Sequence, residues 1–326
     1  MKDQFGRGID YLRISVTDKC NLRCTYCMPV EGLPWIPRAE LLSYEEVAEV
    51  VRQMAALGLR RVRLTGGEPL VRRDLPDLVR QLREVEGIEE ISLSTNAILL
   101  DGVADELRDA GVDRLNISLD TLRRERFAEL ARRPERSFDA TMAGIAAAER
   151  VGFHPLKINV VVMRGVNDDE LADFAARTRD RPWHVRFIEL MPTEGNLFLS
   201  DRYVSADELI GRLRALTALV PVQGPRGNGP ATYFEIPGAQ GTVGVITPLS
   251  HNYCSKCNRM RLTADGRLRT CLFGTHEVDL KRPLRETGDV GAAVREALAG
   301  KPERHFLRIG TAGGSGGLSA LSQVGG

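Results

Sequence analysis

The six cysteines of this 326-residue chain fall into two groups of three, one near each end. The first group has the spacing C-x3-C-x2-C, and the second has the spacing C-x2-C-x13-C. Apolar residues make up 43% of the chain, enough to bury a core without disulfide staples, and the N-terminal sequence lacks the apolar stretch of a secretory signal. We therefore interpret the cysteines as ligands of inorganic centres in a cytoplasmic protein. They are Cys20, Cys24 and Cys27, followed by Cys254, Cys257 and Cys271.

Three thiolates in a group limit the kind of centre that the group can hold. A closed zinc site takes four ligands, and no His or Cys near the first group completes one. A 4Fe-4S cluster held by three thiolates keeps one iron without a protein ligand, and that iron is open to a substrate. The sequence therefore predicts two such clusters. A zinc site with a distant fourth ligand, or incidental core thiols, are the alternatives.

Between Tyr11 and Glu189 the chain alternates short apolar runs with amphipathic segments of helical length, the pattern of six βα units with parallel strands. Ser43 and Glu46 have the spacing of a capping box at a helix start. The expected strands are Leu12–Val16, Arg61–Leu64, Glu90–Ser94, Arg114–Leu119, Leu156–Met163 and His184–Glu189. The expected helices are Ser43–Leu57, Asp74–Val85, Asp101–Ala110, Ser137–Val151 and Asp168–Arg179.

After Pro192 this rhythm gives way to shorter strand-like runs, at Ala231–Ile236 and Thr242–Thr247, separated by Gly and Pro turns. We therefore expect an α/β chain: an incomplete TIM-like (β/α)6 barrel over residues 1–191 and a C-terminal α+β subdomain over residues 192–326 that covers its opening. In such folds ligands bind at the C-terminal ends of the strands.

The first triad resembles the signature of the radical S-adenosylmethionine enzymes, because C-x3-C-x2-C carries an aromatic residue, Tyr26, before its last cysteine. LTGGEPL, at the end of the second expected strand, is similar to the family's GGEP motif. Glycine allows close approach of backbone to a ligand. The resemblance implies that the open iron binds S-adenosylmethionine, whose cleavage gives a 5′-deoxyadenosyl radical. It also implies that Tyr26, Gly67, Ser118 and Met191 line this pocket.

The second triad narrows the resemblance to the GTP 3′,8-cyclase family, which the chain resembles from RISVTDKC through RFIELMP to its final Gly-Gly. The resemblance implies that the second cluster contacts the guanine of GTP. The radical then abstracts hydrogen from the ribose 3′ carbon, and that carbon attacks carbon 8 to give (8S)-3′,8-cyclo-7,8-dihydroguanosine 5′-triphosphate. This reaction opens molybdenum cofactor biosynthesis.

A triphosphate needs several convergent cations, and guanidinium groups pair with phosphate strongly and directionally. If NRMRL is extended, Arg259 and Arg261 lie on one face of a strand. The resemblance implies that the GTP contacts are Arg13, Arg63, Ser94, Lys157, Arg259, Met260 and Arg261. It also implies that the terminal Gly325 and Gly326 insert toward the active site, whereas their composition alone predicts only a flexible tail.

The net charge of +1 gives no global field for nucleic acid or an anionic membrane, and no stretch has the length and apolar character of a spanning helix. We expect GTP as substrate, an electron donor such as flavodoxin or ferredoxin, and a monomer or homodimer. Two alternatives stay open: another radical enzyme with an accessory cluster, such as a peptide modifier, and a zinc-stabilised binding protein without enzymatic activity.

Overall fold

Six parallel strands in chain order form the centre of the molecule. The computed structural model describes residues 1–192, 200–225, 229–305, 307 and 323. Each strand pairs with the next in parallel, and each lies within one residue of its expected bounds. They are β1 (Tyr11–Ser15), β2 (Arg61–Thr65), β3 (Glu90–Thr95), β4 (Arg114–Ser118), β5 (Leu156–Val162) and β6 (Trp183–Glu189). The predicted six-unit partial barrel is confirmed.

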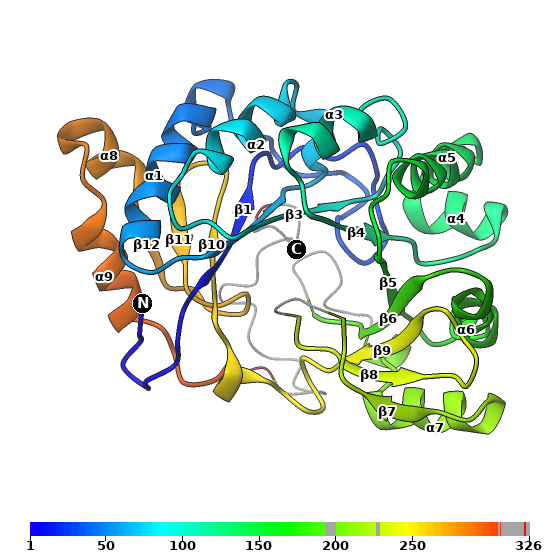
Figure 1. Ribbon diagram of the computed structural model, residues 1–326. Helices are drawn as coiled ribbons and strands as arrows, with labels where there is room; N and C mark the ends of the chain where they lie inside the picture. Colours follow the sequence, from blue (N-terminus) through cyan, green and yellow to red (C-terminus); the bar gives the residue numbers. More distant parts are fainter. Residues whose placement is uncertain (193–199, 226–228, 306, 308–322, 324–326) are drawn as a thin grey trace.

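Helices follow the strands and cover the outer side of the sheet, which curves into an open arc (Figure 1). The capping box predicted for the first helix is present: Ser43 Oγ accepts from the Glu46 amide at 3.1 Å, and Glu46 accepts from the Ser43 amide at 2.8 Å. The helices are α1 (Tyr44–Ala56), α2 (Leu75–Arg83), α3 (Ala104–Ala110), α4 (Arg124–Ala131), α5 (Arg136–Arg150) and α6 (Leu171–Asp180). The sequence prediction missed α4, because its short, charged stretch has little apolar periodicity.

The C-terminal part of the chain extends the same sheet at both edges. β10 (Arg259–Leu262) pairs in parallel with β1, and β9 (Thr242–Ile246) pairs in parallel with β6. Antiparallel strands then continue outward from each of these two strands. They are β11 (Arg267–Arg269) and β12 (Glu277–Asp279) beyond β10, and β8 (Thr232–Glu235) and β7 (Val220–Val222) beyond β9. The arc is therefore a 12-stranded sheet whose two ends both come from C-terminal sequence.

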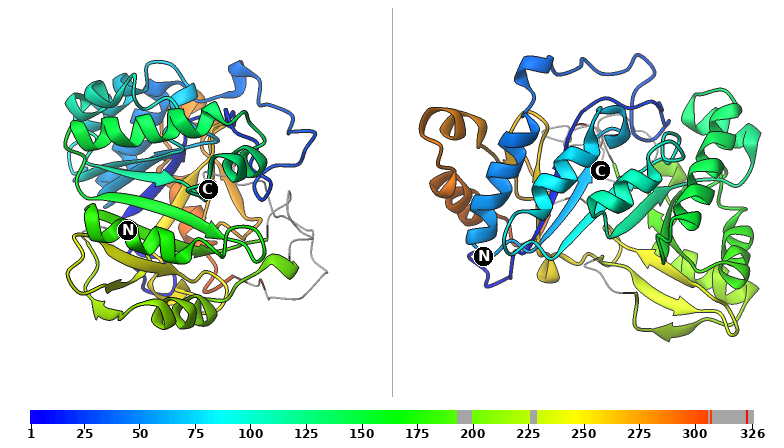
Figure 2. Two further views of the ribbon diagram at one scale, coloured as in Figure 1. Left: turned by 90° about the vertical axis from the view of Figure 1, so that its right-hand side faces the viewer. Right: turned by 45° about the horizontal axis from the view of Figure 1, so that its top comes forward.

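The pairing of β10 with β1 and of β9 with β6 joins the two parts of the chain that we expected to divide at residue 191. That division stays a prediction. The hydrogen-bonded sheet runs across that boundary without a break, and the C-terminal strands extend it at both edges (Figure 2). The remaining helices were not predicted; they are α7 (Ala206–Leu216), α8 (Lys281–Thr287) and α9 (Gly291–Ala299). Four short 3-10 helices complete the described elements: η1 (Arg38–Glu40), η2 (Pro69–Val71), η3 (Ser200–Arg202) and η4 (Cys254–Lys256).

The main hydrophobic core lies between the sheet and the outer helices. Leu12 and Ile14 of β1, and Met260 of β10, are at most 1% exposed within it. Side chains alternate along a strand, so Arg13 and Arg261 point to the opposite, inner side of the arc. The apolar side chains of these strands therefore pack against the helices, and their polar side chains line the inner side of the arc.

Candidate active site: two cysteine triads and two adjoining cavities

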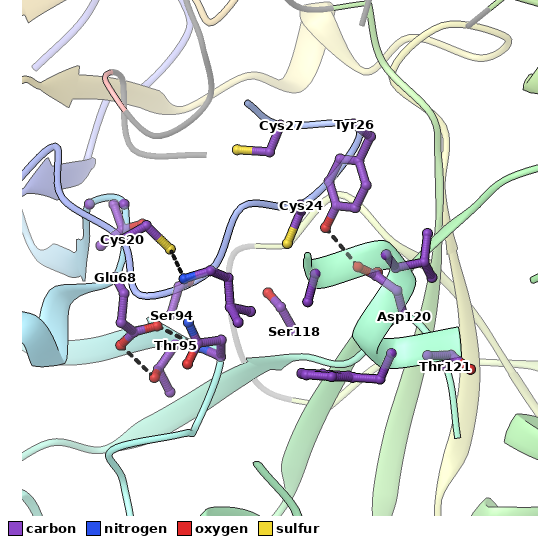
Figure 3. A pocket seen from close by; sticks show the side chains of 18 residues that line it. Cys20, Cys24, Tyr26, Cys27, Glu68, Ser94, Thr95, Ser118, Asp120 and Thr121 are labelled. Atoms are coloured by element: carbon purple, nitrogen blue, oxygen red, sulfur yellow. Dashed lines mark hydrogen bonds between the residues drawn. The ribbon is translucent and has the colours of Figure 1, made fainter. Parts of the chain in front are cut away.

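The first triad occupies the loop that follows β1. Cys20, Cys24 and Cys27 line a cavity of about 850 Å³, part of it open to solvent, at the C-terminal ends of β1 to β4. Figure 3 shows the three thiols set around a common space. Burial raises the pKa of Cys24 well above its ordinary value, and Asp120 and the two neighbouring thiols raise it further. Three thiols that line one cavity suit ligation to a positively charged iron core, which removes the cost of ionising them.

Helix α4 fixes the course of this loop. The amides of Arg23 and Thr25 donate to the carbonyls of Ala131 and Leu130, each at 2.9 Å, and the Arg133 guanidinium donates to the Asn21 carbonyl at 2.5 Å. The Leu22 amide also donates to Cys20 Sγ at 3.3 Å. The helix that the sequence prediction missed is therefore the support of the first triad.

The glycine pair of GGEP lies against the cysteine loop. A Cβ on Gly67 would stand 2.3 Å from the Lys19 carbonyl oxygen, and one on Gly66 would stand 2.5 Å from the Thr17 carbonyl oxygen. The Gly67 amide donates to the Thr17 carbonyl at 2.8 Å. Both glycines also line the first cavity, as predicted for Gly67. Their small size is required by neighbouring backbone as well as by any ligand.

Glu68, the next residue of the motif, joins two strand ends. Its carboxylate accepts from the Thr95 hydroxyl at 2.7 Å, the Asn96 amide at 2.7 Å and the Leu70 amide at 3.1 Å. The carboxylate is buried, and burial raises the pKa of Glu68 to about 7 against these hydrogen bonds. The sequence prediction did not single out this residue, although an acidic side chain at a buried strand end was the available signal.

Tyr26 is held by the half-buried carboxylate of Asp120, which also lines the first cavity. Its hydroxyl donates to Asp120 Oδ2 at 2.8 Å, and the Val161 amide donates to Asp120 Oδ1 at 2.8 Å. Burial raises the pKa of Asp120 to about 6. Ser118, at the end of β4, lines the same cavity. Of the four residues expected around S-adenosylmethionine, Tyr26, Gly67 and Ser118 are thus brought together.

Met191 lies elsewhere: it lines a second cavity, of about 1130 Å³, on the inner side of the arc. Cys254, Cys257 and Cys271 form part of its wall, so the second triad is assembled although 13 residues separate Cys257 from Cys271. Burial opposes ionisation of Cys257, but Lys301 and then Arg259 outweigh it and lower the pKa of this thiol.

Five arginines from four strands face the second cavity. Arg13 on β1 is in register with Arg63 on β2 and with Arg261 on β10, which makes one row across three adjacent strands. Burial lowers the pKa of Arg63 to about 9, and Arg13 and other nearby guanidiniums add repulsion. The full set is Arg13, Arg63, Arg186, Arg259 and Arg261. Arg13, Arg63, Arg259 and Arg261 are arginines that the sequence predicted as GTP contacts, and they line this one cavity.

Several guanidinium nitrogen atoms of the arginines in this cavity make no hydrogen bond within the described part of the chain. They are the Nε atoms of Arg13, Arg186 and Arg259, and each is buried. Buried donors are almost always satisfied. An anion in the second cavity would satisfy these guanidiniums and offset their mutual repulsion, so the residues fit a polyphosphate.

Lys157 and Met260, both expected as GTP contacts, are not among the residues that line the second cavity. Lys157 is buried, and burial lowers its pKa to about 7, with Arg186, Arg114 and Arg63 adding repulsion. The Met260 side chain lies in the hydrophobic core, on the face of β10 opposite Arg259 and Arg261, so we do not carry it into the proposal below. Arg186, which is not among the expected residues, lines the cavity, and its guanidinium donates to Asn116 Oδ1 at 2.7 Å.

Ser94 lies at the boundary between the two cavities. It is the one residue that lines both of them among the residues the structure describes. Its position at the end of β3 places it beside the first triad's cavity and beside the arginine row. A ligand in each cavity would therefore meet near this hydroxyl.

Glu189, at the end of β6, connects the barrel to the segment that precedes the second triad. Its buried carboxylate accepts from the Tyr203 hydroxyl at 2.8 Å and from the amides of Ala206, Leu249 and Ser250 at 2.9 to 3.1 Å. Ser250 precedes η4, which begins at Cys254. This connection is not predicted from the sequence, since its four partners come from two segments that are more than 40 residues apart.

Two further observations concern the described ranges alone. No group of three His, Cys, Asp or Glu side chains there is placed to hold a single metal ion. None of the helices in those ranges has the length and apolar character that crossing a bilayer requires. Gly325 and Gly326, the expected tail residues, lie outside the described residues.

Family models match nearly the whole chain. The Radical SAM superfamily model matches residues 14–177, and the Molybdenum Cofactor Synthesis C model matches residues 183–307. The GTP 3′,8-cyclase of Pelotomaculum thermopropionicum is 49% identical over 315 residues, which cover 95% of this chain and 96% of the relative. The GTP 3′,8-cyclase of Moorella thermoacetica is 46% identical over 330 residues, which cover both chains in full.

Solved structures agree on the fold. Streptococcus suis SuiB bound to S-adenosylmethionine matches 88% of this chain and 68% of its own length, with a TM-score of 0.60 and 15% identity. A structural similarity at 15% identity shows that the barrel architecture is shared and gives no information about the substrate.

Proposed function

The chain belongs to the GTP 3′,8-cyclase family of radical S-adenosylmethionine enzymes, and from this premise we propose that it converts GTP to (8S)-3′,8-cyclo-7,8-dihydroguanosine 5′-triphosphate. This is the first step of molybdenum cofactor biosynthesis. The observation that carries the proposal is the pair of cavities that meet at Ser94, each with three cysteine thiols in its wall. One cavity suits the radical source and the other suits the nucleotide.

We assign the first 4Fe-4S cluster to Cys20, Cys24 and Cys27 and the second to Cys254, Cys257 and Cys271. When bound, the first cluster supplies the electron that cleaves S-adenosylmethionine, and the second offers an open iron to the substrate. The wall of the first cavity also includes the apolar residues Leu22, Phe127 and Leu130. These side chains exclude water from the cavity.

S-adenosylmethionine in the first cavity would be positioned by three elements. The Tyr26 ring, fixed by Asp120, provides an apolar face for a nucleoside base. The Gly66–Gly67 backbone lies beside the cysteine loop, where the methionine amino group must approach. Ser118 adds a hydroxyl at the end of β4. Met191 lines the other cavity, so we assign it to the nucleotide side.

GTP would be oriented by charge. The row of Arg63, Arg13 and Arg261 crosses three strands, and Arg259 stands beside the second triad. Bidentate guanidinium contacts fix the triphosphate in both position and direction. With the triphosphate on this row, the ribose can lie toward Ser94 and the first cavity, and the base toward the second triad. This arrangement brings the ribose 3′ carbon to the boundary where hydrogen is abstracted.

The structure argues against the two alternatives left open by the sequence. A peptide-modifying enzyme does not require a row of arginines in its substrate cavity, and a zinc-stabilised binding protein does not require two adjoining cavities. For the electron, we propose a small acidic one-electron carrier of the flavodoxin or ferredoxin type. Six free thiols and oxygen-sensitive clusters fit the reducing cytoplasm.

The test uses anaerobically reconstituted protein with reductant, S-adenosylmethionine and GTP deuterated at the ribose 3′ carbon. Because cyclisation leaves the nucleotide's elemental composition unchanged, the readout is deuterium in 5′-deoxyadenosine together with a new chromatographic nucleotide peak. The proposal requires both. Deoxyadenosine without deuterium, and unchanged GTP, would mean that the radical assignment holds but the substrate is wrong.

A matched pair of variants separates the two centres. Replacing Cys254, Cys257 and Cys271 with Ala should leave about four irons per chain and uncoupled cleavage of S-adenosylmethionine without nucleotide product. Replacing Cys20, Cys24 and Cys27 with Ala should also leave about four irons but abolish cleavage. The opposite pattern would reverse the assignment.

A further inference from the structure

Lys301 is a buried lysine that the proposed reaction does not use. It follows α9 and is 2% exposed. Its ammonium donates to the Arg259 carbonyl at 3.0 Å and to the Thr270 carbonyl at 2.5 Å, and it hydrogen-bonds the Cys257 thiol. Arg259 is two residues after Cys257, and Thr270 immediately precedes Cys271. One side chain therefore holds the two chain segments that carry two of the three ligands of the second triad.

The third ligand is held by a second cation, from the other end of the chain. The Arg7 guanidinium donates to the Cys254 carbonyl at 2.8 Å and to the carbonyls of Pro302 and Glu303, the residues just after Lys301. Arg7 is also paired with Asp3 at 2.6 Å. Its charge is thus largely balanced by a carboxylate, and its part in this arrangement is to fix backbone.

Lys301 differs from Arg7 in its charge balance. Within the described residues no Asp or Glu forms an ion pair with it, and the groups whose negative charge would act on it most strongly are Cys257 and Cys271 in their thiolate form. A buried cation without a counter-ion is strongly unfavourable, so a buried Lys is normally paired. The natural counter-ion of Lys301 is the centre held by the second triad.

We propose that Lys301 is a positioning residue for the second cluster, whose single positive charge stabilises the reduced, more negative state of that cluster while its hydrogen bonds hold the ligand segments in place. The inference rests on the proposed function, because it requires a cluster at the second triad. With three thiolates, one-electron reduction adds a negative charge beside the Lys301 ammonium. The charge therefore favours the reduced form over the oxidised one.

The experiment isolates the second cluster in the full-length chain by replacing Cys20, Cys24 and Cys27 with Ala. The reconstituted protein is poised with dithionite and redox mediators, and the reduced fraction is measured by electron paramagnetic resonance. In this background we compare Lys301→Met, Lys301→Gln and Lys301→Arg. Gln keeps donors for the two carbonyls but no charge, and Arg keeps the charge, so the two variants separate hydrogen bonding from electrostatics.

We expect both neutral variants to lower the ratio of reduced to oxidised cluster at a fixed potential by about tenfold or more, which is about 59 mV for one electron. Lys301→Arg should stay near the parent value. If the neutral variants hold no iron while Lys301→Arg does, the charge is needed even to retain the cluster, which also supports the inference. A parent-like ratio in Lys301→Gln, or a loss in Lys301→Arg equal to that in Lys301→Gln, overturns it.

Two measurements keep this inference separate from the proposed function. If the background without the first triad binds no iron, the second cluster itself is absent and the proposed function fails at that point. Gln4→Ala is the matched control: the Gln4 amide donates to the Lys301 carbonyl at 3.2 Å, so the variant disturbs the same segment without changing charge. It should retain about four irons per chain and the parent's reduced fraction.

Discussion

Arg13 and Arg261 are register partners in two neighbouring parallel strands, although they come from opposite ends of the chain. Both side chains face the second cavity, beside Arg63 of the next strand. Like charges buried together destabilise the free protein, and burial lowers the pKa of Arg261 well below its ordinary value. The closeness of the two guanidiniums therefore destabilises the ligand-free chain and favours the binding of a polyanion.

Replacing Arg261 with Met should therefore separate stability from binding. We expect the free energy of unfolding of the ligand-free chain to rise by about 1 kcal/mol, because a buried charge is replaced by an apolar side chain of similar length. GTP affinity should fall about 10- to 100-fold, since hydrogen bonds to a charged group contribute about 1.5–3 kcal/mol. Urea unfolding and titration calorimetry measure the two quantities.

The control for this variant is Arg267→Met on β11. The Arg267 side chain is 52% exposed and pairs with Asp265 and Glu277, away from the second cavity. It should change neither quantity by a measurable amount. Equal loss of GTP affinity in both variants would show that the effect is one of net charge and not of the arginine row.

Gly67→Ala should remove the first cluster. The added Cβ would stand 2.3 Å from the Lys19 carbonyl oxygen, so the segment just before Cys20 must move. We expect iron to fall from about eight to about four per chain, with S-adenosylmethionine cleavage lost. Gly211→Ala in α7, where no atom lies within 4 Å of the added Cβ, should keep all the iron and slightly stabilise the helix. Full iron content in Gly67→Ala would contradict the structure.

Tyr26→Phe tests the hydroxyl that contacts Asp120. The variant keeps the ring but loses the 2.8 Å hydrogen bond to the half-buried Asp120 carboxylate that fixes it. We expect S-adenosylmethionine to bind roughly 3- to 10-fold more weakly, as for loss of about 0.5–1.5 kcal/mol. Equilibrium dialysis of reconstituted protein measures this. Tyr44→Phe removes a 2.8 Å hydrogen bond to the Arg73 carbonyl outside the cavities and should leave the affinity unchanged.

Lys157 should couple GTP binding to proton uptake. Burial, then the nearby Arg186, Arg114 and Arg63, lower the pKa of Lys157 to about 7, so at pH 8 the amine of the free chain is mostly neutral. A triphosphate favours the charged form and raises this pKa, so binding takes up a proton and GTP affinity falls as pH rises from 7 to 9.

Calorimetry at pH 8 in two buffers of different ionisation enthalpy measures this uptake. Lys157→Met should abolish it, whereas Lys281→Met, which removes an ammonium paired with Glu40 far from the cavities, should not. Uptake that persists in Lys157→Met would assign the proton to another group. The same shift makes the ligand-free chain less stable at pH 7 than at pH 10, because the unfolded state, with its ordinary Lys pKa, binds more protons in that range.

Much of the site could be read from local sequence. The cysteine spacing, Tyr26 and the GGEP motif are contiguous signals, because the residues around one strand end must lie together wherever that strand goes. The six strands were predicted within one residue because buried parallel strands form short apolar runs. The charged, eight-residue α4 was missed, since short helices are stabilised by tertiary contacts more than by their own sequence.

What the sequence by itself determined was the inventory: six βα units, two sets of three thiols, and basic residues on particular strands. Tertiary structure alone decided which of these meet. The pairing of β10 with β1 aligns Arg261 with Arg13, and the folding of the chain ends brings Arg7 and Lys301 around the second triad. The tertiary structure also places Met260 in the hydrophobic core and Met191 in the wall of the second cavity. Local patterns encode which face a side chain takes, whereas hydrogen bonding between distant strands sets which faces come together.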